Sequence, residues 1–385
     1  MKSKFLLAAA FAVFAFSASA QKDRAREFGI PFEGQPGTYN AITDVPGVEV
    51  GYKTKISGSG DVVVGKGPVR TGVTVILPQG KTASGVPAGW FCLNGDGEMT
   101  GTTPIEEYGL LYGAIGITNT NSVGVVRDAI GEWNIKRFST GGLFDFSFGL
   151  PVAAETYDGM LNDINGLHIK KEDVFEALDA AKSGPVVEGN VGGGTGMGLY
   201  LFKGGNGTSS REVRFGAVKY TVGAFVQANF GGRQDLMIAG VPVGKEMAKD
   251  AWPIMHTKPK DGSIIIVIAT NAPLLPSHLK LLAKRASLGV ARTGGFAYNG
   301  SGDIFIAFST AQPQMNQDET LQTWTTVPKE QMDRIYKAAV QATEEAIINA
   351  LMAAETMEGI NGNTLYEIPK DKLREIMKKY NRLNK

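Results

Sequence analysis

The sequence predicts a single α/β domain in which at least one strand is buried on both faces. The run from Ile264 to Ala269 is apolar and β-branched, which is typical of a strand covered on both sides. Between residues 39 and 77, valines alternate with polar residues and glycines, as in half-buried strands. Residues 329–357 are rich in alanine and polar on one side, which indicates a long helix. No repeat, linker or low-complexity tract divides the chain, so these elements belong to one domain.

The remaining elements follow in chain order. We expect a helix at 105–115, a strand and turn at 115–126, and a helix that begins near Arg127. Residues 171–182 have the charges of a helix, acidic early and basic late, before the stop at Gly184-Pro185. The other expected elements are strands at 220–229 and 304–308, a helix at 274–288 and a short helix after Pro369.

The first 20 residues have the pattern of a signal peptide. Lys2 and Lys4 precede an apolar run at 5–16, and Ala18-Ser19-Ala20 offers the small residues that signal peptidase requires. The run is shorter than the roughly 20 residues that span a bilayer, which disfavours a retained anchor. We expect cleavage after Ala20 and export to the periplasm or outside the cell, with no membrane attachment afterwards.

The composition excludes several classes of function. The 39 basic and 38 acidic residues leave no net field for nucleic acid or an anionic membrane. Cys92 is the one cysteine, so no internal disulfide is possible, and we expect it to be a small buried side chain. His168, His256 and His278 form no metal-binding pair by spacing, so we expect neither a metal nor a cofactor.

Three glycine-rich or serine motifs do not match. The segment 192–198 never satisfies G-x-G-x-x-G, and Gly80-Lys81-Thr82 lacks the first glycine of a phosphate loop because Val75 stands there. No serine lies in G-x-S-x-G. These glycines are better explained as tight turns beside a pocket.

A serine at a newly formed chain terminus can act without a histidine base. Its own α-amine, with a usual pKa of about 7.7 to 8.0, can take the hydroxyl proton. Ser263 suits that role because it heads the buried strand and follows Gly262, whose carbonyl is open to attack. From spacing alone, Asp261-Gly262-Ser263 is better explained as an ordinary turn before a strand.

Ordered blocks along the chain favour the nucleophile. They lie at 24–34, 42–48, 119–126, 188–197, 226–231, 261–266 and 300–304. With these blocks the chain resembles the DmpA-type L-aminopeptidase D-Ala-esterase/amidase family, relatives of the β-peptidyl aminopeptidases. The resemblance extends from about Arg24 to Thr310, which is nearly the whole exported chain.

The resemblance implies a fold and a maturation step. The family fold is a four-layer αββα sandwich that resembles N-terminal nucleophile hydrolases with different connectivity. Members cleave themselves before the serine that matches Ser263. Here that cut between Gly262 and Ser263 gives an α chain at 21–262 and a β chain at 263–385, within one domain at 21–385. Family members also suggest a homotetramer of αβ units.

The resemblance also implies roles for individual residues. Asn229 and Tyr157 would lie near the oxyanion, while Ser301 and Asp303 would contact the nucleophile and its amine. The β-peptide branch is expected to have glutamate where Asp303 stands, so the preference for α- or β-amino acids stays open. A substrate ammonium needs an anionic or carbonyl partner, for which the candidates are Glu155 and Glu188, with structural pairing as the alternative for each.

The sequence therefore predicts a self-cleaving serine aminopeptidase or amidase. It would remove small N-terminal residues from peptides, amides or esters through an acyl-enzyme on Ser263. Two alternatives remain at this point. One is an ornithine-acetyltransferase-like acyl transferase, which normally has threonine at the cleavage point, and the other is a periplasmic solute-binding protein without cleavage.

Overall fold

The computed structural model describes residues 24–141, 149–256, 262–312, 314–315 and 320–384. The predicted signal peptide and Asp261 lie outside these ranges. Within them, no helix is long and apolar enough to cross a membrane.

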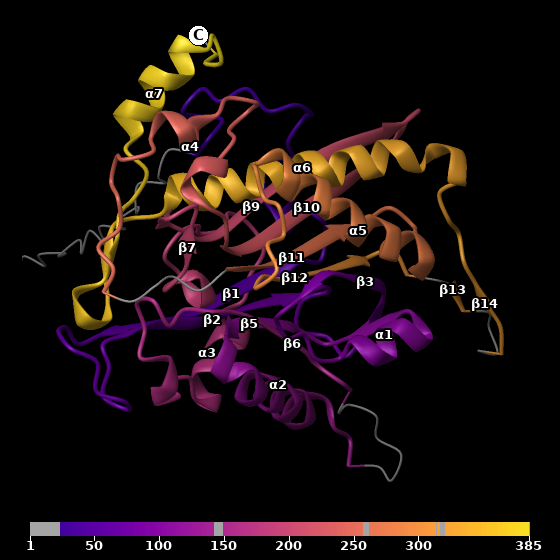
Figure 1. The fold of residues 1–385 in the computed structure, drawn as a ribbon. Helices are drawn as coiled ribbons and strands as arrows, with labels where there is room; N and C mark the ends of the chain where they lie inside the picture. Colours follow the sequence, from indigo (N-terminus) through magenta and orange to yellow (C-terminus); the bar gives the residue numbers. More distant parts are fainter. Residues whose placement is uncertain (1–23, 142–148, 257–261, 313, 316–319, 385) are drawn as a thin grey trace, which may run out of the picture.

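Two β-sheets lie face to face at the centre of the molecule (Figure 1). The smaller sheet has the strand order β1-β2-β5-β6, and the larger has the order β4-β3-β12-β11-β10-β9. The smaller sheet comprises β1 (Glu49–Ser57), β2 (Val69–Leu77), β5 (Ile115–Asn119) and β6 (Val152–Thr156). The larger comprises β3 (Gly85–Gly95), β4 (Leu110–Tyr112), β9 (Gly205–Phe215), β10 (Val218–Asn229), β11 (Ser263–Thr270) and β12 (Gly302–Ser309).

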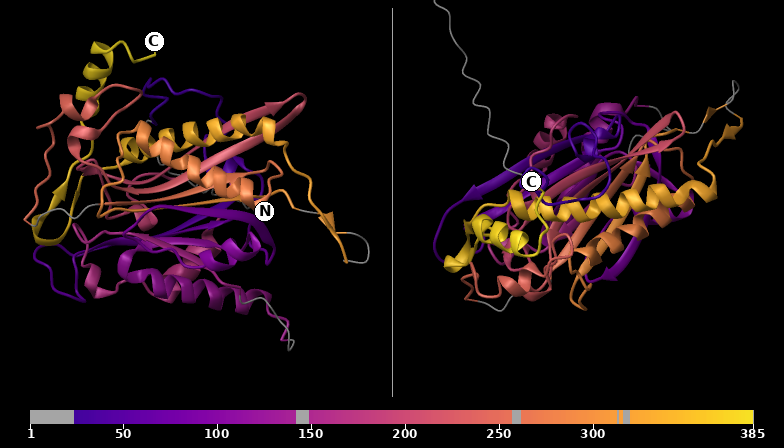
Figure 2. Two further views of the ribbon diagram at one scale, coloured as in Figure 1. Left: turned by 45° about the vertical axis from the view of Figure 1, so that its right-hand side comes forward. Right: turned by 90° about the horizontal axis from the view of Figure 1, so that it is seen from above.

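Helices cover the outer face of each sheet. Helices α5 and α6 lie over the larger sheet, and α2 and α3 lie under the smaller one (Figures 1 and 2). The resulting order of layers, αββα, confirms the predicted fold class. The helices are α1 (Thr102–Tyr108), α2 (Val123–Phe138), α3 (Lys171–Ala180), α4 (Val243–Glu246), α5 (Pro276–Arg292), α6 (Met332–Ala353) and α7 (Lys370–Lys379). Two-residue strand pairs complete the fold: β7 (Gly198–Leu199) with β8 (Phe202–Lys203), β13 (Gln314–Met315) with β14 (Gln322–Thr323), and β15 (Met357–Glu358) with β16 (Thr364–Leu365).

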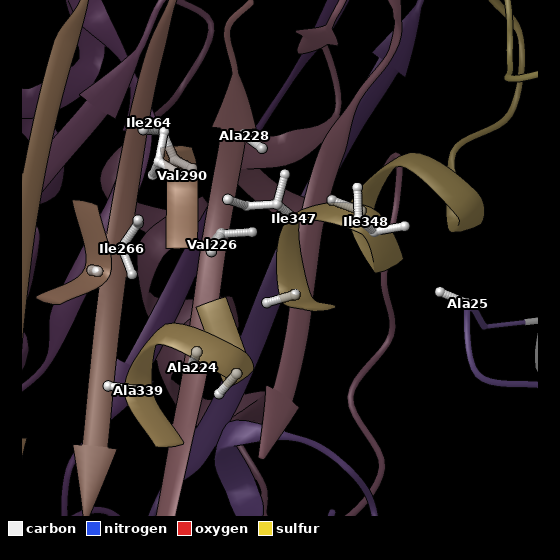
Figure 3. Packing of buried hydrophobic residues seen from close by; sticks show 14 of the residues in the cluster. Ala25, Ala224, Val226, Ala228, Ile264, Ile266, Val290, Ala339, Ile347 and Ile348 are labelled. Carbon is white, nitrogen blue, oxygen red and sulfur yellow. The ribbon is translucent and has the colours of Figure 1, made fainter. Parts of the chain in front are cut away.

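Strand β11 is buried on both faces, as its sequence predicts. Ile264, Ile266 and Ile268 pack toward α5 and α6, whereas Ile265 and Val267 pack between the sheets. Figure 3 shows the first of these cores, where Ile347 of α6 lies beside β10 and Val290 of α5 lies beside Ile264 of β11. The same alternation sets the direction of the Ser263 side chain. Because Ser263 lies two residues before Ile265, its side chain points into the space between the sheets.

Three sequence expectations differ from the structure. The helix expected at 105–115 is α1, which ends at Tyr108 because Gly109 adopts a left-handed conformation (φ 71°), and residues 110–112 form strand β4. The segment 123–126 begins helix α2 instead of extending a strand, because Val123 and Val126 pack between α2 and the smaller sheet and this packing overrides the β propensity of valine. Cys92 is exposed, not buried, because burial declines along the second half of β3. Local sequence patterns predict no element at residues 205–215, which form strand β9. It is a strand because α6 covers it closely, and a Cβ on Gly207 would lie 2.0 Å from the Ala346 carbonyl oxygen.

Candidate active site

The ends of four neighbouring strands lie side by side at one end of the larger sheet. Ser263 at the start of β11 pairs with Asn229 at the end of β10 and with Gly302 at the start of β12. Gly302 in turn pairs with Gly95 at the end of β3. Because β11 and β12 are parallel and β10 and β3 run the opposite way, the predicted residues from distant parts of the chain come together here.

Ser263 lies in a restrained position. Its side chain is buried, and its Oγ accepts a hydrogen bond of 3.2 Å from the backbone N–H of Gly302. An oxygen that accepts from a fixed backbone donor is held in one rotamer, which is what a nucleophile aimed at a neighbouring carbonyl requires.

Gly262 presses against the neighbouring strand. A Cβ at this position would lie 1.8 Å from the carbonyl oxygen of Asn229 and 2.6 Å from Phe230 Cα. No side chain fits between them without moving the backbone. The residue before Ser263 is therefore glycine for a steric reason, and its carbonyl carbon is unshielded.

Asp303 is a buried carboxylate on β12, where it pairs with Ile264, the residue that follows Ser263. Its Oδ1 accepts a hydrogen bond of 2.7 Å from Ser301 Oγ, and its Oδ2 is buried without a hydrogen-bond partner among the described residues. Burial raises the pKa of Asp303 to about 6, and the hydrogen bond from Ser301 partly opposes this shift. The open oxygen can accept a proton or a cationic group that forms nearby.

Asn229 has a fixed orientation. Its Oδ1 accepts from the backbone N–H of Gly198 at 2.7 Å, and its Nδ2 donates to the carbonyl of Tyr157 at 2.9 Å. A carboxamide has two N–H donors, so one remains for an oxyanion formed next to Ser263. Tyr157 is half-buried. Its burial and, to a smaller extent, the nearby Asp158 raise the pKa of its phenol. The structure thus places Ser263, Asn229, Ser301 and Asp303 at adjoining strand ends, and Tyr157 contacts Asn229 through its backbone carbonyl.

The two candidate glutamates differ in their surroundings. Glu155 lies near the end of β6 and accepts from Thr120 Oγ1 at 2.5 Å and from the Glu98 N–H at 3.2 Å. Glu155 lies near the start of β12, because Gly97 contacts both residues: a Cβ on Gly97 would lie 3.2 Å from Glu155 Oε1 and 3.0 Å from Gly302 Cα.

Glu188 has a structural partner. Arg24 Nε donates to its Oε2 at 2.7 Å, Arg24 Nη2 donates to its Oε1 at 3.1 Å, and the Thr208 N–H also donates to Oε1. Both carboxylate oxygens are occupied by groups that tie the N-terminal segment to β9. Glu188 is therefore explained by structural pairing with Arg24. Glu155 stays the candidate partner of a substrate ammonium.

A cleft of about 270 Å³ lies beside these strand ends. Asn229, Gly262, Ser301 and Asp303 line it on the catalytic side. Its other walls include Phe296 and Tyr298, which lie on the segment between α5 and β12 and are 70% and 49% exposed. Sequence reasoning missed these two aromatic residues, although a glycine pair followed by exposed aromatics just before the Ser301 block was a usable signal. The glycine-rich segment does lie beside a pocket, as expected, through Gly198.

Asp158 is a second buried carboxylate near the site, and sequence reasoning missed it. Burial raises its pKa to about 7, although Asn162 Nδ2 donates to its Oδ1 at 3.0 Å and the nearby polar groups of Thr71 and Asn119 oppose the shift. In the unfolded chain an aspartate has a pKa of about 3.9. The folded state therefore binds the additional proton between about pH 4 and pH 7, so this group makes the protein less stable as the pH rises through that window.

We expect Asp158→Asn to remove this pH dependence. In a Ser263→Ala background, the parent should lose stability relative to the Asp158→Asn variant between pH 5 and pH 7, by up to about 1.4 kcal/mol per pH unit. Above pH 7 the difference should stay constant. Urea unfolding at pH 5, 7 and 8 measures the difference, and identical pH dependence in both proteins would contradict the raised pKa.

The described residues contain no group of three or more His, Cys, Asp or Glu side chains that could hold a metal ion. The chemistry available at this edge consists of a hydroxyl, a carboxylate and a carboxamide.

Comparison with known proteins gives consistent matches over nearly the full chain. The model of peptidase family S58 matches residues 40–365. The beta-peptidyl aminopeptidase BapA of Sphingosinicella microcystinivorans is 51% identical over 393 residues, covering 99% of this chain and 98% of its own. The BapA of Sphingosinicella xenopeptidilytica is 50% identical over 386 residues, covering 97% and 95%.

Solved structures share the fold. The L-aminopeptidase D-Ala-esterase/amidase of Ochrobactrum anthropi, described as a prototype for the serine aminopeptidases and a new variant of the Ntn hydrolase fold, superposes with a TM-score of 0.87 at 47% identity, covering 94% of this chain and 100% of that one. A beta-aminopeptidase of a Burkholderia species has a TM-score of 0.82 at 43% identity, covering 92% and 98%. These likenesses confirm the predicted fold class and the resemblance drawn from the sequence.

Proposed function

The chain belongs to peptidase family S58, and from this premise we propose that it is a self-cleaving serine aminopeptidase whose nucleophile is Ser263. One observation carries the proposal. Ser263, the carboxamide of Asn229 and the buried carboxylate of Asp303 lie at adjoining strand ends, beside a glycine that tolerates no side chain.

Maturation is an N-to-O acyl shift. Ser263 Oγ attacks the carbonyl carbon of Gly262, and the remaining N–H of Asn229 stabilises the oxyanion. The bond from that carbon to the Ser263 nitrogen then breaks, and the nitrogen takes the hydroxyl proton. Water hydrolyses the resulting ester, which yields a Gly262 carboxylate and a Ser263 with free hydroxyl and free α-amine.

The mature site uses the amine that cleavage releases. The α-amine accepts the Oγ proton as Ser263 attacks the carbonyl carbon of a substrate's N-terminal residue. The leaving amine or alcohol departs with a proton, and water resolves the acyl-enzyme. The buried Oδ2 of Asp303 supports this role, because an anion at that point attracts the ammonium form and raises the pKa of the amine.

We expect Glu155→Gln to weaken substrate binding. Loss of a charge-assisted contact with the substrate ammonium is worth roughly 1.5 to 3 kcal/mol, which corresponds to an increase in KM of about 10- to 100-fold with a smaller change in kcat. Steady-state kinetics with an amino-acid p-nitroanilide measures both constants.

Glu188→Gln is the matched control. It removes the same charge from a carboxylate that pairs with Arg24, so it should lower the melting temperature and leave KM unchanged. Equal effects of the two substitutions on KM would contradict the assignment of Glu155.

The test of the function is hydrolysis without an acyl acceptor. We expect purified enzyme to release p-nitroaniline from alanine p-nitroanilide in buffer alone, and the β-alanine analogue tests whether β-amino acids are also accepted. Strict dependence on an added acceptor would instead support an acyl transferase. Absence of any turnover, together with an uncut chain and ligand binding, would support a solute-binding protein.

Export and assembly are further parts of the proposal. We propose cleavage after Ala20, so that Gln21 begins the α chain, and assembly into a tetramer of αβ units. N-terminal sequencing of the α chain and sedimentation analysis of the purified protein test these two points.

A further inference from the structure

A buried lysine lies behind the oxyanion site. Lys203 is fully buried at the end of β8, and its Nζ donates to the carbonyls of Met197 and Gly204, each at 2.8 Å. An ammonium is costly to bury, even when it is hydrogen-bonded, and an apolar side chain of similar length would fill the same volume without that cost. The function described so far gives Lys203 no role.

The Met197–Gly198 peptide connects Lys203 to Asn229. The carbonyl of this peptide accepts from Lys203 Nζ, and its N–H, on Gly198, donates to Asn229 Oδ1 at 2.7 Å. The Asn229 Nδ2 then donates to the Tyr157 carbonyl at 2.9 Å. Hydrogen bonds arranged in a chain polarise one another, so a cation at one end strengthens the donor at the other. The same chain fixes which way the carboxamide points.

The hairpin that holds Lys203 is strained and strongly anchored. Tyr200 and Leu201 connect β7 to β8 with φ values of 53° and 58°, a left-handed conformation that side chains disfavour. Arg233 donates to both of their carbonyls, and the Tyr200 N–H donates to the carbonyl of Phe230 at 2.8 Å. Since Phe230 directly follows Asn229, the hairpin is tied to the strand end that carries the carboxamide.

We propose that Lys203 is a positioning residue of the oxyanion site, which orients and polarises the Asn229 carboxamide through the Met197–Gly198 peptide. The inference rests on the proposed function, because that function assigns Asn229 to the oxyanion. A residue that acts on the transition state should change kcat and leave KM nearly unaltered. Precursor cleavage passes through a similar oxyanion, so it should slow as well.

The test is Lys203→Met, which removes the ammonium and keeps the length of the side chain. Loss of one oxyanion donor costs about 10²- to 10³-fold, and we expect a group that acts through that donor to cost less, about 10- to 100-fold in kcat. KM should stay within about twofold, and cleavage of the precursor should slow by a factor similar to that for kcat. Lys203→Gln also removes the charge but keeps a polar N–H donor, one bond nearer the backbone, so its loss in kcat should be no larger than that of Lys203→Met.

Arg70→Met is the matched control. Arg70 is another buried cation whose guanidinium donates to backbone carbonyls, those of Ser57, Gly58, Val69 and Glu358. This variant should lower the melting temperature and leave kcat unchanged.

Three outcomes would overturn the inference. In the first, Lys203→Met lowers the melting temperature as Arg70→Met does but leaves kcat and precursor cleavage unchanged. In the second, its whole effect falls on KM. In the third, Lys203→Met does not fold and Lys203→Gln has wild-type kcat. A loss with Asn229→Ala but none with either Lys203 variant would reject the inference and keep the proposed function, whereas a wild-type chain that neither cleaves nor hydrolyses would reject both.

Discussion

We expect Ser263→Ala to leave the precursor as one chain and to remove the peptidase activity. Without the hydroxyl, the Gly262 carbonyl has no nucleophile, and the α-amine that would serve as base is never released. Removal of the nucleophile of a serine hydrolase lowers kcat by about 10⁶-fold, so we expect activity below detection. Denaturing electrophoresis and turnover of an amino-acid p-nitroanilide measure the two effects.

Ser309→Ala is the control for this substitution. Ser309 is also buried and ends β12, the strand that pairs with β11, but its Oγ donates to the Ala272 carbonyl at the opposite end of the sheet from the site. This variant should cleave and turn over substrate as the wild type does. A Ser263→Ala protein that still yields two chains would contradict the assigned nucleophile.

We expect Asn229→Ala to slow both cleavage and turnover by about 10²- to 10³-fold. This range is the usual loss when one oxyanion donor is removed, and KM should change little because the donor acts on the transition state. The rate of precursor cleavage and the steady-state constants of the mature enzyme measure the effect.

Asn349→Ala controls for the loss of a buried carboxamide. Asn349 on α6 accepts from the Ala25 N–H and donates to the Thr208 carbonyl, away from the strand edge that carries Ser263. Its substitution should reduce stability and leave kcat unchanged. Similar kcat losses for the two variants would show that the effect of Asn229→Ala is structural and would remove the residue from the mechanism.

The local sequence predicts the two strands at whose starts Ser263 and Asp303 lie. The β-branched run after Ser263 identifies β11, and strand β12 was likewise expected at 304–308, so the placement of both strand starts was accessible. The joint placement of Asn229 and Tyr157 came from the family resemblance, because strand pairing between residues so far apart leaves no mark in local spacing.

Other features depend on tertiary contacts that local patterns do not encode. Glu188 has its partner, Arg24, 164 residues away, so spacing could not separate structural pairing from substrate binding. Lys203 has a role only because two left-handed residues reverse the chain and bury its ammonium under Met197. The pKa of Asp158 is raised by burial, which depends on how the two sheets and their loops pack.

The intact masses of the purified chains test the central claim most directly. We predict two polypeptides, of which one ends at Gly262 and the other begins at Ser263 and runs to Lys385, with a free α-amine on Ser263. A single uncut chain, or a new N-terminus at any residue other than Ser263, would contradict the account.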